Sequence, residues 1–363
     1  MTAQRILSLR TRWPRLSMEQ VLQFIVGALP LLMLTVLLAT LVSISTAKAT
    51  DAAACKGNNL LESMAKENPA LLAEIQAEAD AIPNGRGIFW KIEKDGVKPS
   101  WLLGTMHVTD PRVLKMPEGA RLAAADANVV VIESDEILDE NKAGSALLMH
   151  PELTMFTDGT SIKDHLDAAS LTKLDEGLKQ RGLSLAVVAK MKPWILASFV
   201  ALPACELSRK AGGASFLDMQ IAKDAVAAGK PVAGLETLVE QLEAMADLPI
   251  DFHFKALVET ITLGDKMEDV METMTELYLS GDIGMTMPLL KTVAPSTTEG
   301  DESAYAAFES RIISDRNLVM AKGSTQHLEK GNAFIAVGAL HLPGEQGLVE
   351  LLRRQGYRLS RVE

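Results

Sequence analysis

Short apolar runs at both ends of the chain enclose a long middle part whose apolar residues recur at helical spacing. The runs 88–92, 100–103, 128–133 and 332–337 are rich in β-branched or bulky apolar residues and bounded by turn residues, which predicts buried strands. Leu, Ala and Met patterns predict helices at 58–82, 117–127, 161–182, 184–202, 216–228, 238–246, 303–321 and 347–356. The pattern predicts an α/β (α+β) fold, with a mixed central sheet and a large helical insertion at about 137–330.

Glycine and proline positions refine these boundaries. Lys94-Asp95-Gly96 predicts a hairpin turn, and Pro69 is expected to divide the first helical stretch into two. Residues 230–236 read as a short strand that follows a glycine-capped helix. Residues 288–300 are expected to form a loop. Gly323 is expected to end the helix predicted at 303–321.

One sequence motif occurs twice: an apolar run that ends in Gly-x-x-His. Residues 100–107 read Ser-Trp-Leu-Leu-Gly-Thr-Met-His, and residues 334–341 read Phe-Ile-Ala-Val-Gly-Ala-Leu-His. Gly104 and Gly338 would let the backbone turn tightly and approach a ligand. A single such histidine is most simply a strand cap, but the repetition favours two pseudo-symmetric halves that place His107 and His341 at one site. Two imidazoles and a carboxylate are the usual minimum for a divalent metal held by protein side chains.

Glu133 ends the most apolar strand after the N-terminal segment. An unpaired carboxylate is costly to bury, so Glu133 is expected to be paired or functional. It would complete a two-histidine, one-carboxylate metal site, or act as the base on metal-bound water. Asp135 and Glu136 are expected to face solvent, although one of them could replace Glu133.

Three other charged residues are candidates for supporting roles. Glu236 leaves the short strand and could hold an imidazole in one tautomer, with a helix N-cap as the alternative. Asp218 lies in a helical pattern, where an ion pair is the simplest role. Arg316 could stabilise an anionic intermediate, or it could form an ordinary surface salt bridge.

The first 49 residues have the order of a secretory signal peptide. Several arginines precede an uncharged apolar run at 24–42, and Ala47-Lys48-Ala49 offers a cleavage site. An uncleaved signal anchor is the alternative, because the run is long enough to span a bilayer. Either interpretation places residues 50–363 in the periplasm or outside the cell, as a single domain that meets the membrane only through the N-terminal segment.

Charge and cysteine content limit the possible functions. The net charge is −11 and the first 49 residues are basic, so the exported part is acidic, which argues against nucleic-acid binding. Cys55 and Cys205 are the two cysteines, and in an oxidising compartment they are expected to pair. The motifs of elbow-type serine hydrolases, HExxH metallopeptidases, P-loop NTPases and dinucleotide-binding enzymes are missing from the sequence.

In its two Gly-x-x-His motifs and the intervening Glu133, the chain resembles the TraB/PrgY/GumN family, which includes the Tiki-type proteases. The resemblance covers roughly residues 55–360 and is strongest where the Gly-x-x-His pair and the intervening Glu133 occur together. The matching residues are 101–107, 131–133, 216–218, 234–237, 316–317 and 337–344.

This resemblance implies an exported metal-dependent hydrolase, of the Tiki peptidase type, that acts on a peptide or protein. His107, His341 and Glu133 would hold the ion, and Mn, Co, Zn and Fe all remain open because the set contains no thiolate. A non-catalytic envelope protein that sequesters peptide, haem or metal is one alternative. An accessory factor of polysaccharide export, with structural histidines, is another.

Overall fold

The computed structural model describes residues 55–293, 303 and 306–362. Contacts divide the chain into Met1–Asp51 and Ala52–Glu363, and every described residue belongs to the second unit. The expected leader at 1–49 therefore lies outside the described residues, as does most of the loop expected at 288–300. Within the described ranges, no helix is long and apolar enough to cross a membrane.

A mixed six-stranded sheet forms the centre of the described unit. Its strands run in the order β4-β3-β5-β2-β1-β6. The first four are mutually parallel, whereas β1 is antiparallel to both of its neighbours. The strand bounds are β1 Phe89–Lys94, β2 Val97–Thr105, β3 Val129–Ile132, β4 Val232–Gly234, β5 Ala333–Gly338 and β6 Arg358–Arg361. The mixed α/β class expected from the sequence is confirmed.

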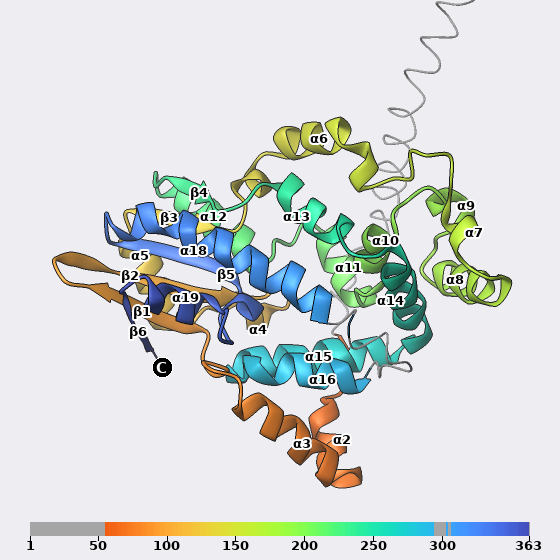
Figure 1. Ribbon diagram of the computed structural model, residues 1–363, viewed down its shortest axis with the longest axis horizontal. Coiled ribbons are helices and arrows are strands. Elements are labelled where there is room, and N and C mark those ends of the chain that lie inside the picture. Colours follow the sequence, from red (N-terminus) through yellow and green to blue (C-terminus); the bar gives the residue numbers. More distant parts are fainter. Residues whose placement is uncertain (1–54, 294–302, 304–305, 363) are drawn as a thin grey trace, which may run out of the picture. The chain divides into compact units, whose positions relative to one another are not determined.

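Helices surround this sheet and fill the long connection between β3 and β5. Helices α5 and α12 cover one face of the sheet, and α18 and α19 cover the other (Figure 1). Outside the β3–β5 connection lie α2 Leu60–Glu67, α3 Pro69–Asp80, α4 Pro111–Leu114, α5 Glu118–Asp126 and α19 Leu348–Arg354. Within it lie α6 Glu140–Met149, α7 Ile162–His165, α8 Ala168–Gln180, α9 Leu185–Val188, α10 Pro193–Val200, α11 Ala204–Ala211, α12 Leu217–Ala227, α13 Leu238–Ala246, α14 Ile250–Leu263, α15 Lys266–Ser280, α16 Thr286–Val293 and α18 Asp315–Leu328. Short 3-10 turns are η2 Asp135–Leu138, η3 Pro151–Leu153, η4 Ile283–Met285 and η6 Ala339–His341, and η5 Glu309–Ser314 is π-helical.

The sheet and the insertion bury separate apolar clusters. Leu102, Val131 and Phe334 lie in the cluster on the sheet and are almost fully buried. Helices α7 to α10 and α14 enclose a second cluster that includes Leu174 and Leu257. The helical insertion therefore contributes a core of its own, while other parts of it, such as Leu217 of α12 and Tyr278 of α15, join the cluster on the sheet.

Several predicted boundaries are confirmed, but the helices expected at 161–182 and 184–202 are each divided in two, as α7 with α8 and as α9 with α10. The hairpin pairs β1 with β2, and Asn68 caps α3 by accepting from the backbone N–H of Leu71, with Pro69 in the first turn. The motif strands β2 and β5 are parallel neighbours, with Thr105 opposite Gly338. The two copies of the motif therefore lie side by side in the sheet.

Three further local predictions were wrong or incomplete. Gly323 lies inside α18, where a Cβ would come within 3.2 Å of Leu235, so this glycine serves close packing instead of a helix end. Pro288 lies in the first turn of α16, where its missing N–H costs no helical hydrogen bond. Strand β6 was not predicted, because Leu359 is its one buried residue and the apolar pattern is too short to recognise.

Candidate functional site

The carboxyl ends of the four parallel strands meet at one edge of the sheet, and each is followed by a predicted site residue. Along this edge the order is Glu236 after β4, Glu133 after β3, His341 after β5 and His107 after β2. Ligands bind at this edge in open α/β sheets. A pocket of about 270 Å³ opens there, and His107, Glu133 and His341 line it together with Arg316.

His341 is buried and held in one orientation. Its Nδ1 lies 2.7 Å from Oδ1 of Asn317 in α18, and the amide of Asn317 donates to the carbonyl of Gln346 at 2.8 Å. This second bond orients the amide so that Oδ1 accepts the proton of Nδ1. Nε2 therefore keeps its lone pair and faces Oε1 of Glu133 at 3.7 Å. Burial lowers the pKa of His341 to about 4, so its ring is neutral at neutral pH.

Glu133 is a buried carboxylate whose two oxygens are both engaged. Oε1 accepts from the backbone N–H of Gly338 at 2.7 Å. Oε2 accepts from Nη2 of Arg316 at 2.7 Å and from the amide of Gln241 at 3.2 Å. Burial alone would raise the pKa of Glu133, but the two site histidines and Arg316 outweigh it and lower that pKa to about 2. The side chain is therefore a carboxylate across the physiological range.

Arg316 joins the two carboxylates of the site. Its Nε and Nη2 donate to the carboxylate of Glu236 at 2.7 to 3.2 Å, and Nη2 also reaches Glu133. Glu236 thus contacts Arg316 instead of an imidazole, which differs from the role expected for it. This guanidinium is already paired with both Glu236 and Glu133. Its contacts therefore favour a role in holding Glu133 in place over the expected role of stabilising an anionic intermediate.

His107 is the exposed member of the site. Its side chain is 53% exposed, and Nε2 lies 3.4 Å from Oδ2 of Asp218 in α12. The other oxygen of Asp218 accepts from the hydroxyl of Thr105 at 2.7 Å. The surrounding protein disfavours a charged ring, but the carboxylate of Asp218 outweighs this and raises the pKa of His107 to about 9. The ion pair expected for Asp218 is therefore made with His107.

Both motif glycines lie where a side chain would collide with the site. A Cβ on Gly104 would come within 2.3 Å of Leu342 and 3.0 Å of Ala339, in the turn that delivers His341. A Cβ on Gly338 would come within 3.1 Å of Oε1 of Glu133. The glycines thus allow the close backbone approach that the sequence predicted.

The donor types of this site fit a divalent cation. His341 presents a neutral Nε2, Glu133 is ionised, and no described residue donates a hydrogen bond to the buried Oδ2 of Asp218. Such nitrogen and carboxylate donors suit Mn, Co, Zn or Fe. Among the described residues, no three His, Cys, Asp or Glu side chains stand at metal-ligand spacing. His107 now faces Asp218, so it would have to turn toward the other donors to share an ion with them.

Several contacts of the site were not predicted. The side-chain carbonyl of Asn317 contacts His341, and the side-chain amide of Gln241 donates to Glu133. Both residues lie in helices outside the Gly-x-x-His motifs. Tyr278 of α15 donates to the carbonyl of Gly104 at 3.0 Å. Glu136, expected to face solvent, is buried and accepts from the first backbone N–H of α13, at Leu238. Asn317 directly follows Arg316 in the sequence, which was the one available signal.

The predicted disulfide is present. Cys55 and Cys205 are bonded, with their Cα atoms 5.4 Å apart and a sequence separation of 150. This bond ties the segment before α2 to the first turn of α11. The pairing of the two cysteines is thereby confirmed.

Comparison with known proteins finds three relatives of similar sequence and one matching protein family. The chain is 24% identical to Metalloprotease TIKI1 of Danio rerio over 316 residues, which cover 75% of this chain and 62% of the relative. The proteins of the same name from Xenopus tropicalis and Homo sapiens are also 24% identical, over 74% and 75% of this chain and 60% and 61% of their own lengths. The chain thus spans about three-fifths of the length of these relatives. No solved structure matches it significantly. Residues 88–361 match the TraB/PrgY/gumN family, and this chain therefore belongs to that family.

Proposed function

We propose that this chain is an exported peptidase that works with a divalent metal ion held by His107, His341 and Glu133. The observation that supports this most strongly is the meeting of the three side chains at the carboxyl ends of adjacent parallel strands, in one pocket. Relatives with similar sequences bear the name metalloprotease. The other roles weighed from sequence, binding or export without catalysis, do not require this set of donors.

Glu133 serves in this proposal as a ligand and not as the base. A carboxylate with a pKa of about 2 is a weak proton acceptor at neutral pH, whereas its negative charge attracts a cation. Arg316 and the backbone N–H of Gly338 keep the carboxylate in place. A bound divalent ion would polarise the scissile carbonyl and acidify a water molecule.

The pocket also suggests which residues of a peptide bind beside the reacting bond. Met106, Met274, Ile283 and Leu340 supply much of its wall, and Thr286 adds a hydroxyl. A pocket of about 270 Å³ with mostly apolar walls suits one medium-sized apolar side chain. We therefore expect cleavage next to Leu, Met or Val in preference to charged residues.

Export is supported by the pairing of the cysteines. Stable disulfides form in oxidising compartments and are rare in the cytosol. Cys55 follows the expected leader closely and is bonded to Cys205. The periplasm or the cell exterior is therefore the proposed location, with the N-terminal segment as signal peptide or anchor.

Cleavage of a fluorogenic peptide library by residues 50–363 tests the proposed activity. Wild type should cleave after addition of Mn, Co or Zn, lose activity with a chelator, and regain it when metal is restored. His341→Ala and Glu133→Gln should be folded and inactive. Absence of cleavage with every metal would reject the peptidase and favour a binding protein.

A further inference from the structure

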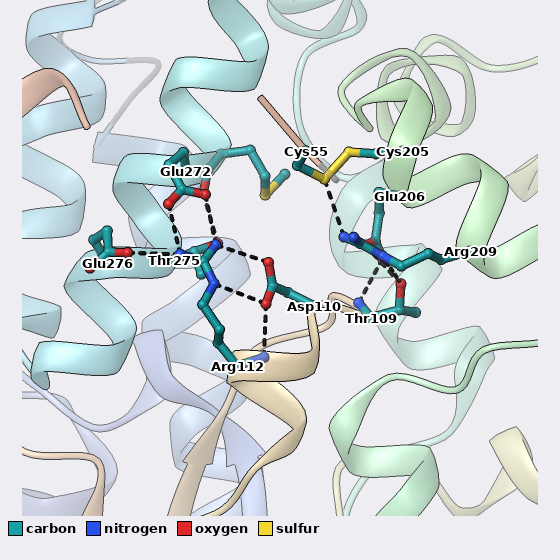
Figure 2. Close-up of polar contacts among 11 residues, drawn as sticks. Cys55, Thr109, Asp110, Arg112, Cys205, Glu206, Arg209, Glu272, Thr275 and Glu276 are labelled. Carbon is teal, nitrogen blue, oxygen red and sulfur yellow. Dashed lines mark hydrogen bonds and ion pairs between the residues drawn. A yellow bond between two sulfur atoms is a disulfide. The ribbon is translucent and has the colours of Figure 1, made fainter. Parts of the chain in front are cut away.

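The loop that follows His107 is held by charged side chains from two helices (Figure 2). This loop, residues 106–110, is here called the His107 loop. On one side, Thr109 contacts Glu206 and Arg209 of α11. On the other side, Asp110 meets Arg112, which pairs in turn with carboxylates of α15. Neither set of contacts belongs to the pocket itself.

Glu206 makes the closest of these contacts. It is 1% exposed, and it accepts from the backbone N–H of Thr109 and from the hydroxyl of Thr109, both at 2.8 Å. Each carboxylate oxygen takes one of these bonds. A buried carboxylate is costly unless its hydrogen bonds are made, so Glu206 fixes both the backbone and the side chain of Thr109. Thr109 is two residues from His107.

Arg209 links this contact to the disulfide. Its Nε donates to the hydroxyl oxygen of Thr109 at 3.1 Å, and its Nη2 donates to Glu206 at 3.0 Å. The same Nη2 lies 3.2 Å from Sγ of Cys55. Since Cys205 immediately precedes Glu206, the disulfide anchors the helix end that carries the clamping carboxylate.

The same helix reaches His107 directly. Nζ of Lys210 lies 3.4 Å from the carbonyl oxygen of His107 and 5.4 Å from the ring centre of Phe216. The ring of Phe216 in turn lies 5.3 Å from the ring of His107. One face of α11 therefore contacts the His107 loop at both His107 and Thr109.

The opposite side of the loop is fixed to α15. Arg112 donates to Asp110 at 2.9 Å, to Glu272 at 2.7 Å and to Glu276 at 2.8 Å. Helix α15 also supplies Met274 to the pocket. In Figure 2, Thr109 and Asp110 of the loop lie between the contacts to α11, which bears Cys205, and the contacts to α15.

We propose that Glu206 is a positioning residue for His107, and that its hydrogen bonds to Thr109 keep the imidazole within reach of the site. The inference rests on the proposed function for the claim that His107 binds metal. It goes beyond that function because Glu206 lies outside the pocket. Residues that orient a metal ligand typically change metal affinity by about 10–100-fold when they are altered.

The test compares Glu206→Gln and Thr109→Val with Thr109→Ser, which keeps the hydroxyl. Glu350→Gln is the matched control. Glu350 is also paired with an arginine, Arg353, and accepts from Asn84, but neither partner belongs to the His107 loop. Binding of Co²⁺ alone is measured by calorimetry and by the visible spectrum of the bound ion. Hydrogen exchange is measured over residues 106–110, and circular dichroism identifies variants that are folded.

Glu206→Gln and Thr109→Val should bind Co²⁺ at least about tenfold more weakly, with an altered spectrum and faster exchange in the His107 loop. Thr109→Ser and Glu350→Gln should stay within about twofold of wild type. Wild-type affinity and spectrum in folded Glu206→Gln and Thr109→Val would overturn the proposal.

A separate result distinguishes failure of the proposed function. If wild type binds no Co²⁺, Mn²⁺ or Zn²⁺, the metal-dependent function is rejected, and hydrogen exchange alone decides the role of Glu206. Faster exchange at residues 106–110 in Glu206→Gln, with wild-type exchange in Thr109→Ser, would then support the clamp. Unchanged exchange in Glu206→Gln would overturn it.

Discussion

At the scale of single residues, the two site histidines are held in opposite protonation states. Burial keeps His341 neutral, with a pKa lowered to about 4, while Asp218 overcomes desolvation and raises the pKa of His107 to about 9. A metal ligand must give up its proton before it binds. A divalent ion therefore finds one imidazole ready and must displace a proton from the other.

This difference predicts a pH dependence of metal binding. At pH 7 His107 is protonated in the metal-free protein and His341 is not, so binding should release about one proton and tighten about tenfold per pH unit up to about pH 9. Calorimetry in two buffers of different ionisation enthalpy measures the released proton. Asp218→Asn should bring the pKa of His107 down and reduce the release at pH 8. Binding that does not change between pH 7 and pH 9 would contradict the assignment.

Asn317 offers a second prediction at this scale. Its side-chain carbonyl accepts from Nδ1 of His341. Asn317→Leu should therefore leave a buried N–H unpaired and weaken metal binding by about 10–100-fold. Asn317→Asp keeps an acceptor at the same place and should lose less affinity. The dissociation constants can be measured by competition with a fluorescent chelator. Equal affinity in the Leu variant and wild type would show that Asn317 does not orient the ligand.

At the scale of elements, the site depends on adjacent strands whose ends carry Gly-x-x-His. The sequence predicted the strands, the glycine turns and both histidines, because an apolar run and a glycine are local signals. It did not predict that β2 and β5 would be neighbours with Thr105 opposite Gly338, since pairing depends on the whole sheet. Glu206 carried no local signal, and Asn317 was marked only by its place next to Arg316, because helical patterns do not reveal which residue faces a strand end.

Gly104→Ala tests the close approach of these elements. The new Cβ would collide with Leu342 and Ala339, so the turn η6 with His341 must shift. We expect a loss of about 1–3 kcal/mol in the free energy of unfolding, with weaker metal binding. Gly144→Ala in α6 meets no atom within 4 Å and should be neutral or slightly stabilising. Urea denaturation measures the free energy of unfolding of both variants. Equal stability of Gly104→Ala and Gly144→Ala would refute the packing argument.

At the scale of the whole molecule, one covalent bond joins parts of the chain that are 150 residues apart. Pairing of Cys55 with Cys205 was predictable from the count of cysteines and the expected compartment. The position of the bond next to Glu206 was not, because it depends on where α11 packs. The disulfide therefore links stability to the side of the site that carries His107.

Removal of this bond should destabilise the fold. A Cys55→Ser, Cys205→Ser double variant should lose about 2–5 kcal/mol in the free energy of unfolding, mainly because its unfolded chain is less restricted. Guanidinium denaturation without reductant measures this loss, and wild type in the presence of reductant should approach the same midpoint. A midpoint equal to that of oxidised wild type would show that the bond adds nothing to stability.

His107, Glu133 and His341 are far apart in the sequence, and we propose that they form one metal site at the strand ends. Metal content of purified residues 50–363 tests it most directly, with wild type beside His107→Ala, His341→Ala and Glu350→Gln. We expect close to one divalent ion per chain in wild type and Glu350→Gln, and almost none in either folded histidine variant. Metal-free wild type that takes up no Mn, Co or Zn, or metal retained in both histidine variants, would contradict it.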